Sequence, residues 1–120
     1  MKKTAPEIVR TKDFIKLIED KYNAPTTYKM AQLLGVSRNT VKRFKEGEII
    51  KHASIMVKVS ELLDVDLSYV IYNILAEEAE KDGEQDVAQS FVQTAQQYAP
   101  IGIAITACFC LLFLPYISFV

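Results

Sequence analysis

The fold of this chain is decided by residues 27–47, which read TYKMAQLLGVSRNTVKRFKEG. Thr26 and Thr27 have the hydroxyl groups that commonly cap the first turn of a helix, so we expect a short helix that runs through Leu34. Gly35 can adopt the left-handed backbone conformation that ends a helix in a sharp turn. The first half of the window therefore predicts one short helix and a tight turn.

The second half of the window predicts another helix, over residues 38–45. Ser37 can cap this helix, and Gly47 ends it. The small side chain of Ala31 allows the two helices to cross closely. The core between them is expected to contain Leu34, Val36, Val41 and Phe44. The spacing thus indicates two short helices that cross at a steep angle, the second with a basic outer face.

Apolar residues recur at helical spacing on both sides of this window. We expect helices over residues 12–22 and 54–63, the first capped by Thr11. Asp66 or Ser68 can cap a fifth helix, whose apolar residues are Leu67, Val70, Ile71, Ile74 and Leu75. The first helix is expected to face the core with Phe14, Ile15, Leu17, Ile18 and Tyr22. The sequence has no β-type alternation of useful length, so it predicts an all-α domain of five short helices.

An acidic segment forms the expected end of the fifth helix and marks the domain boundary. We interpret it as a solvated helix end rather than a metal site, because its carboxylates scatter around the helix: Glu77, Glu78, Glu80, Asp82, Glu84 and Asp86. Apolar periodicity lapses at Gly83, which separates a domain over residues 1–83 from a connector helix over residues 84–99. The connector has apolar side chains on one side and glutamines on the other.

Charge is distributed unevenly along the 120 residues. Residues 1–58 hold 13 basic and 6 acidic side chains and residues 59–120 hold 1 basic and 9 acidic ones, although the net charge is only −1. A basic N-terminal half suits a phosphate-rich partner. The single histidine, His52, is expected at a loop or helix start, and both cysteines lie in an apolar tail, so we find no catalytic set, metal site or cofactor site. The sequence favours a binding protein over an enzyme.

The window 27–47 resembles the helix-turn-helix of the phage repressor and Cro superfamily, the Xre family, and the similarity extends over most of residues 12–76. The segment KVSELLDVDLSYVI, residues 58–71, looks like the fourth helix of that family, its short turn and the start of its fifth helix. Residues 44–47 are similar to the aromatic-x-x-Gly ending of its recognition helix. Thr27 and Lys45 depart from the Gln and Glu that the family often has there. The resemblance implies a lambda-repressor-like domain of five helices that binds duplex DNA.

The resemblance also implies which residues contact DNA. The helix over residues 38–45 would enter the major groove with its N-terminal half first and present Ser37, Arg38, Asn39, Lys42 and Arg43. Arg38 could pair with guanine and Asn39 with adenine. Contacts to the phosphate backbone are implied for Thr27, Tyr28, Lys29, Lys45 and Lys51. The alternative is a merely solvated basic face, but the basic face coincides with the helix that the pattern places in the groove, which favours DNA.

The C-terminal residues 101–120 read IGIAITACFCLLFLPYISFV and contain no charged side chain. Twenty helical residues span about 30 Å, the thickness of the hydrocarbon layer of a bilayer. We therefore expect a transmembrane helix over residues 100–120. This helix would make the chain a single-pass protein of the inner (cytoplasmic) membrane with its N-terminal domain in the cytoplasm. The alternative is a hydrophobic helix buried against the domain or across a dimer interface.

These expectations lead to three candidate functions. The first is a phage-type transcriptional regulator, anchored in the membrane, that binds double-stranded DNA as a homodimer, because two modules on two half-sites give usable specificity. The second is a membrane-anchored phage interaction or assembly protein that uses the helical domain to dock to proteins. The third is a soluble regulator whose apolar tail forms the dimer core. We favour the first function.

Overall fold

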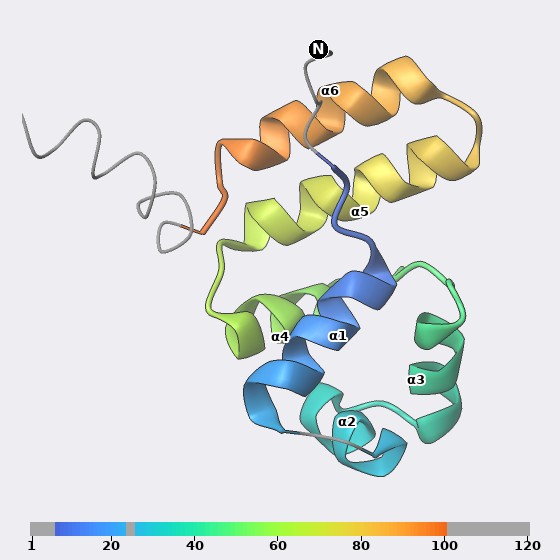
Figure 1. Cartoon of the computed structure of the whole chain (residues 1–120), viewed down its shortest axis with the longest axis vertical. Coiled ribbons are helices and arrows are strands. Elements are labelled where there is room, and N and C mark those ends of the chain that lie inside the picture. Colours follow the sequence, from blue (N-terminus) through green and yellow to red (C-terminus); the bar gives the residue numbers. More distant parts are fainter. Residues whose placement is uncertain (1–6, 24–25, 101–120) are drawn as a thin grey trace, which may run out of the picture.

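The computed structural model describes residues 7–23 and 26–100, in which every regular element is an α-helix (Figure 1). The six helices are α1 (Thr11–Tyr22), α2 (Thr27–Leu34), α3 (Arg38–Lys45), α4 (Ala53–Leu63), α5 (Leu67–Lys81) and α6 (Gln85–Gln96). The all-α fold class is confirmed. Seven helices were expected, and the seventh, the membrane span over residues 100–120, lies outside the described part except for Pro100. None of the described helices is long and apolar enough to cross a bilayer.

Side chains cap three of the helices at the expected positions. The hydroxyl oxygens of Thr26 and Ser37 and a carboxylate oxygen of Asp66 each accept a backbone N–H bond from the first turn of α2, α3 and α5. These bonds satisfy N–H groups that have no partner within the helix. The short helices therefore begin where their caps place them, and His52 lies directly before α4, as expected.

The main core lies between the first five helices. Phe14, Ile15 and Ile18 of α1 are buried there, together with Ile49 and Ile50 of the segment between α3 and α4. The other four helices contribute Met30, Ala31, Leu34, Val41, Phe44, Ile55, Val59, Val70 and Ile74. Leu17 and Tyr22 were expected to face this core, but they are 48% and 38% exposed. The buried stripe of α1 has i, i+3, i+4, i+7 spacing, and Leu17 points away from it. Tyr22 continues the stripe at the end of α1, but its side chain is partly open to solvent and its hydroxyl donates to the Leu62 carbonyl oxygen at 2.6 Å.

Thr11 was expected to cap α1, but Arg10 takes the N-cap position and Thr11 is fully buried as the first helical residue. The Thr11 backbone N–H and hydroxyl both donate to the same carboxylate oxygen of Glu77, at 2.9 and 3.0 Å. The Thr11 hydroxyl oxygen also accepts the Ile50 backbone N–H at 3.1 Å. Thr11 therefore joins α1 to α5 and to the segment after α3.

The interpretation of the acidic segment as a solvated helix end is wrong for Glu77, which is only 6% exposed. The start of α1 covers this part of α5, a tertiary contact that no local pattern reveals. Next to it, the Arg10 guanidinium donates to both carboxylate oxygens of Glu80, at 2.7 and 3.2 Å. The Val9 backbone N–H donates to the Asn73 side-chain oxygen at 2.9 Å. One flank of α5 is thus fixed to the N-terminal segment.

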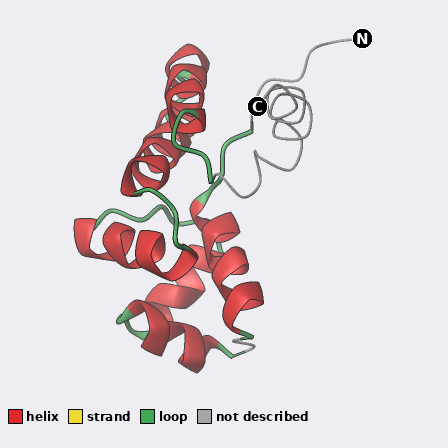
Figure 2. Cartoon of the chain, turned by 90° about the vertical axis from the view of Figure 1, so that its left-hand side faces the viewer, coloured by secondary structure: helices red, strands yellow, loops and turns green. Residues whose placement is uncertain are grey.

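The last helix, α6, lies antiparallel to α5, and together they form a hairpin (Figure 1). The hairpin projects beyond the other four helices (Figure 2). Ala88 and Val92 of α6 are buried against Ala76 and Ala79 of α5 and against Ile8, which together form a second small core. The connector helix expected over residues 84–99 is thus present as α6, and it packs on the helix before it.

We predict that Glu77→Gln changes the pH dependence of stability. Burial raises the pKa of the Glu77 carboxyl above its ordinary value of 4.5, and the bonds from Thr11 only partly oppose this effect. The folded state then holds the proton more tightly than the unfolded state, so the wild-type chain loses stability as pH rises from the ordinary pKa through the raised one. Gln keeps an acceptor oxygen for Thr11 and cannot ionise, so the variant avoids this loss.

Urea unfolding between acidic and neutral pH measures the effect. The free energy of unfolding of Glu77→Gln, relative to wild type, should rise with pH and then level off. Glu61→Gln, at an exposed position on α4, reports the effect of the lost charge alone. A pH-independent difference between Glu77→Gln and wild type would contradict the prediction.

Candidate nucleic-acid interface

The basic helix α3 is held in place by its two buried side chains. Val41 and Phe44, at i and i+3, are 0% and 3% exposed and face the core. Ala31 and Leu34 of α2 are buried in the same core, and Val36 packs against it, which confirms the expected contacts between the two helices. The back of α3 is therefore anchored in the core, while Arg38, Asn39, Lys42 and Arg43 on its outer side are exposed.

The turn between α2 and α3 depends on Gly35. Its φ of +73° lies in the left-handed region that residues with a side chain rarely adopt. The N–H groups of Gly35 and Val36 both donate to the Ala31 carbonyl oxygen, at 2.8 and 3.1 Å. This compact turn sets the direction in which α3 leaves α2.

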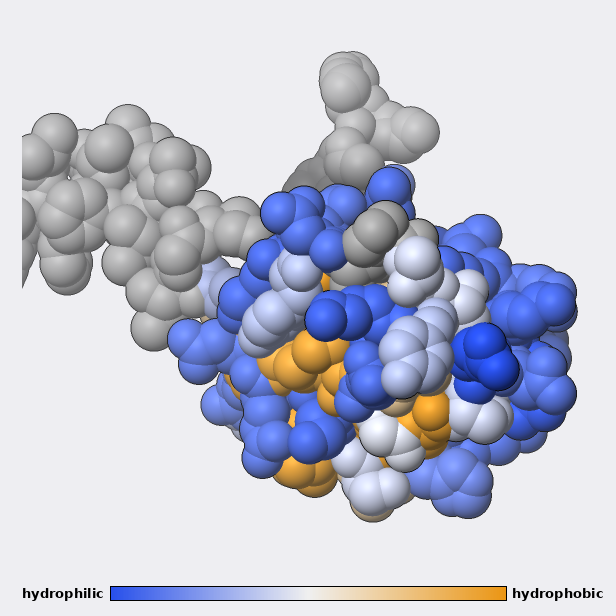
Figure 3. All heavy atoms as spheres, turned by 90° about the horizontal axis from the view of Figure 1, so that it is seen from below, coloured by the Kyte–Doolittle hydropathy of each residue, from blue (hydrophilic) through white to orange (hydrophobic). Residues whose placement is uncertain are grey.

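The outer face of α3 presents all five of the residues expected to face DNA. Each is exposed: Ser37, Arg38, Asn39, Lys42 and Arg43. Seen from below, hydrophilic residues cover the side of the molecule on which α3 lies (Figure 3). This face carries amide, guanidinium and ammonium groups, which are the hydrogen-bond donors that bind base edges and phosphates.

The starts of α2 and α3 come together at Arg38. Its guanidinium lies 5.9 Å from the centre of the Tyr28 ring, a cation–π contact, and Tyr28 is 56% exposed. The Gln32 side-chain amide donates to the Tyr28 hydroxyl at 3.0 Å. Gln32 was not among the expected site residues, although its i, i+4 spacing from Tyr28 on an exposed helix face could have indicated it. Arg38 and Tyr28 thus form one polar and aromatic surface.

Two basic residues of this helix are engaged by carboxylates. Arg43 lies 3.2 Å from Glu48, with both side chains about half exposed, and such pairs contribute at most about 1 kcal/mol. Lys45 lies 2.6 Å from Glu19 of α1, and the two side chains are only 36% and 21% exposed. Lys45 therefore points toward α1 rather than along the outer face. The Glu19 partner is remote in sequence, so no local pattern could reveal it.

The remaining expected residues lie at the edges of this surface. Thr27 is partly buried and Lys29 is exposed, both in the first turn of α2. Lys51 is exposed in the segment between α3 and α4. The N-terminus of α2 and its Lys29 side chain offer positive potential at one edge of the α3 face.

We predict that Ser37→Ala destabilises the domain by about 0.5–2 kcal/mol, the usual loss for an N-cap. The Ser37 hydroxyl oxygen accepts the Thr40 N–H at 3.2 Å and lies 3.0 Å from the Thr40 hydroxyl oxygen. The matched control is Ser54→Ala, at an exposed position in the first turn of α4, for which we expect no comparable loss. Equal urea midpoints for wild type and Ser37→Ala would show that this cap is not needed.

The site therefore consists of an exposed basic helix, packed at its back and joined to the start of the preceding helix. Comparison of the chain with protein-family models, curated proteins and solved structures gave no match.

Proposed function

We propose that this chain is a sequence-specific DNA-binding regulator of the phage repressor and Cro type, anchored in the membrane by residues 100–120. Helices α1 to α5 would form a lambda-repressor-like domain with α3 as the recognition helix. The observation that carries the proposal is the exposure of Arg38, Asn39, Lys42 and Arg43 on one short helix whose back is buried through Val41 and Phe44.

The shape and chemistry of α3 support binding in the major groove. An α-helix fits this groove, and residues of its N-terminal half reach the base edges. Arg38 and Asn39 occupy the first two positions of α3, where a guanidinium suits guanine and an amide suits adenine. The Tyr28 ring beneath Arg38 limits the freedom of the guanidinium before binding. Direct contacts to bases are therefore assigned to the start of α3.

Contacts to phosphates are assigned to the edges of the same surface. Lys42 lies one turn beyond Arg38, and Thr27, Tyr28 and Lys29 lie at the N-terminus of α2, where the helix dipole favours anions. Arg43 can exchange Glu48 for a phosphate at little cost, because their ion pair is exposed to solvent. Lys45 has the more sheltered carboxylate partner, so we expect it to contribute less than Lys42.

A homodimer and a membrane anchor complete the proposal. One module of this size buries a small area on DNA, and two copies on half-sites about one helical turn apart would give useful specificity. The uncharged residues 101–120 match the thickness of a bilayer. DNA is reached only from the cytoplasm, so the N-terminal domain would lie on that side of the inner membrane.

We predict that two substitutions on α3 weaken DNA binding in different ways. Arg38→Ala should cost about 1–3 kcal/mol on a duplex selected from a random library and relax the preference at one base pair. Lys42→Ala should weaken binding to all duplexes about equally and lower the salt dependence by about one phosphate contact. Fluorescence anisotropy with the full chain in detergent micelles, at two salt concentrations, measures both effects.

Lys81→Ala is the matched control, because Lys81 is an exposed lysine at the end of α5 rather than on α3. It should bind DNA as the wild type does. Salt-sensitive binding that survives Arg38→Ala, Asn39→Ala and Lys42→Ala unchanged would refute the assigned surface. A folded chain that binds no duplex would favour docking to a protein instead.

We predict that the full chain stays in the membrane pellet after carbonate extraction. Leu111→Arg, in the middle of residues 101–120, should shift the chain toward the soluble fraction, since a central arginine costs about 2.5–3.5 kcal/mol on insertion. Leu111→Ala is the control and should remain in the pellet. Recovery of the wild-type chain in the soluble fraction would refute the anchor.

A further inference from the structure

The hairpin of α5 and α6 has an apolar surface that is separate from its buried contacts. We call it the apolar hairpin face and define it by Ile71, Tyr72, Leu75, Val87, Phe91 and Tyr98. Val87 and Tyr98 are 43% and 37% exposed, and the other four side chains are partly exposed. Only Phe91 packs against either of the two cores. Such a half-exposed apolar surface indicates a contact beyond the described residues.

The helical spacing shows how this face is built. Helix α6 buries Ala88, Val92 and Ala95. Val87, Phe91 and Tyr98 form a stripe on one flank of the buried residues, and glutamines occupy the opposite flank: Gln89, Gln93 and Gln96. From α5, the Tyr72 ring lies 6.2 Å from the Phe91 ring and is stacked on the Tyr98 ring at 6.1 Å. The aromatic side chains of the two helices therefore form one continuous surface.

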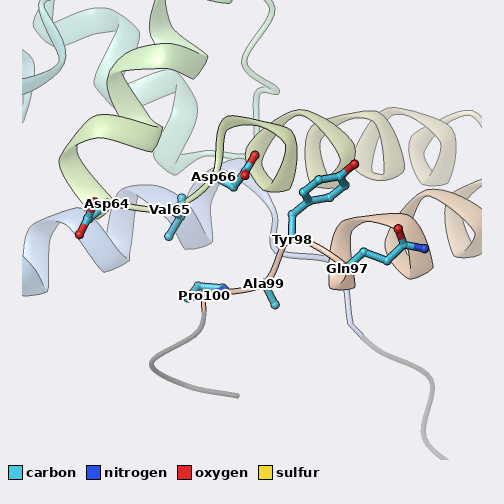
Figure 4. Close-up of a pocket in the computed structure, with 7 residues that line it drawn as sticks. All are labelled: Asp64, Val65, Asp66, Gln97, Tyr98, Ala99 and Pro100. Atoms are coloured by element: carbon cyan, nitrogen blue, oxygen red, sulfur yellow. The ribbon is translucent and has the colours of Figure 1, made fainter. Parts of the chain in front are cut away.

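One end of the face lies where the uncharged tail begins. The described chain ends at Pro100, beside the turn between α4 and α5, and residues 64–66 and 97–100 line a pocket of about 420 Å³ there (Figure 4). Tyr98, which belongs to the apolar hairpin face, lies two residues before Pro100 in the sequence. If residues 101–120 cross a bilayer, this end of the hairpin must lie at the membrane surface.

The chemistry of α6 suits lipid headgroups better than bulk water. Tyrosine and other aromatic side chains favour the boundary between hydrocarbon and water. Residues 87–100 contain no charged side chain, so this part of α6 can approach a bilayer without removing charges from water. The covalent link at Pro100 also keeps the local concentration of lipid high. A lipid surface is therefore the occupant that these observations favour.

We propose that the apolar hairpin face lies on the membrane surface, with α6 parallel to the bilayer and Val87, Phe91 and Tyr98 among the headgroups. This inference rests on the proposed anchor. Contact of this face with the bilayer would hold the domain in one orientation, whereas an anchor alone would let the domain rotate relative to the membrane. The α3 surface would remain accessible to DNA, because α3 packs with α1 and α2 away from α6 (Figure 1).

The chain contains no tryptophan, so a single introduced tryptophan reports its own position without background. The test uses full-length Phe91→Trp and Val87→Trp in phosphatidylcholine vesicles whose acyl chains are brominated, since bromine quenches tryptophan on contact. Residues in the interface lie close to the acyl chains, so the emission of both variants should fall about twofold relative to unbrominated vesicles. Val87→Trp alters an exposed site and guards against misfolding of Phe91→Trp.

Gln93→Trp is the matched control, because it lies on the exposed glutamine flank of the same helix and should not be quenched. Unquenched Phe91→Trp and Val87→Trp in a chain that resists carbonate extraction would overturn the inference and leave the anchor intact. A blue-shifted but unquenched emission would also overturn it, by indicating a second copy or residues 101–120 on the face. Loss of the chain on carbonate extraction would refute the anchor and this inference together.

Discussion

The described structure depends on one buried hydrogen-bond acceptor, the Glu77 side-chain oxygen that Thr11 contacts. A carboxylate that leaves water must be satisfied by hydrogen bonds, and here the Thr11 N–H and hydroxyl supply two of them. Because the Thr11 hydroxyl oxygen also accepts the Ile50 N–H, this junction ties together α1, α5 and the segment that leaves α3. The adjacent pair of Arg10 and Glu80 strengthens the same contact. The hairpin is therefore fixed relative to the basic helix rather than loosely attached to it.

This fixed arrangement gives the two proposed surfaces a defined relation. The basic face of α3 and the apolar hairpin face belong to one packed body, and they differ in the partner that their chemistry suits. Guanidinium and ammonium groups suit phosphate, whereas uncharged aromatic side chains suit a lipid boundary. The small net charge of −1 is thus the sum of a basic N-terminal half and an acidic C-terminal half, rather than a sign of a neutral surface.

Most of the helical architecture could be predicted because its determinants are local. Thr26, Ser37 and Asp66 cap helices through bonds to residues within three positions, and Gly35 makes a turn that depends on its own φ. The exposure of the basic residues of α3 could be predicted from helical periodicity, because Val41 and Phe44 at i and i+3 define the buried side of that helix. The errors arose where a side chain at the edge of an apolar stripe, such as Leu17, or inside an acidic run, such as Glu77, has an environment set by another helix.

The sequence by itself determined the helices, their caps and the exposure of the basic residues of α3, because neighbouring residues decide hydrogen bonding within a turn and the period of burial. Only the tertiary structure decided that Glu77 is buried, that Lys45 pairs with Glu19 and that α6 packs along α5. Glu77 bonds to Thr11, 66 positions away, and Lys45 pairs with Glu19, 26 positions away (45 − 19). The formation of these contacts depends on how whole helices meet, which periodicity within one helix does not encode.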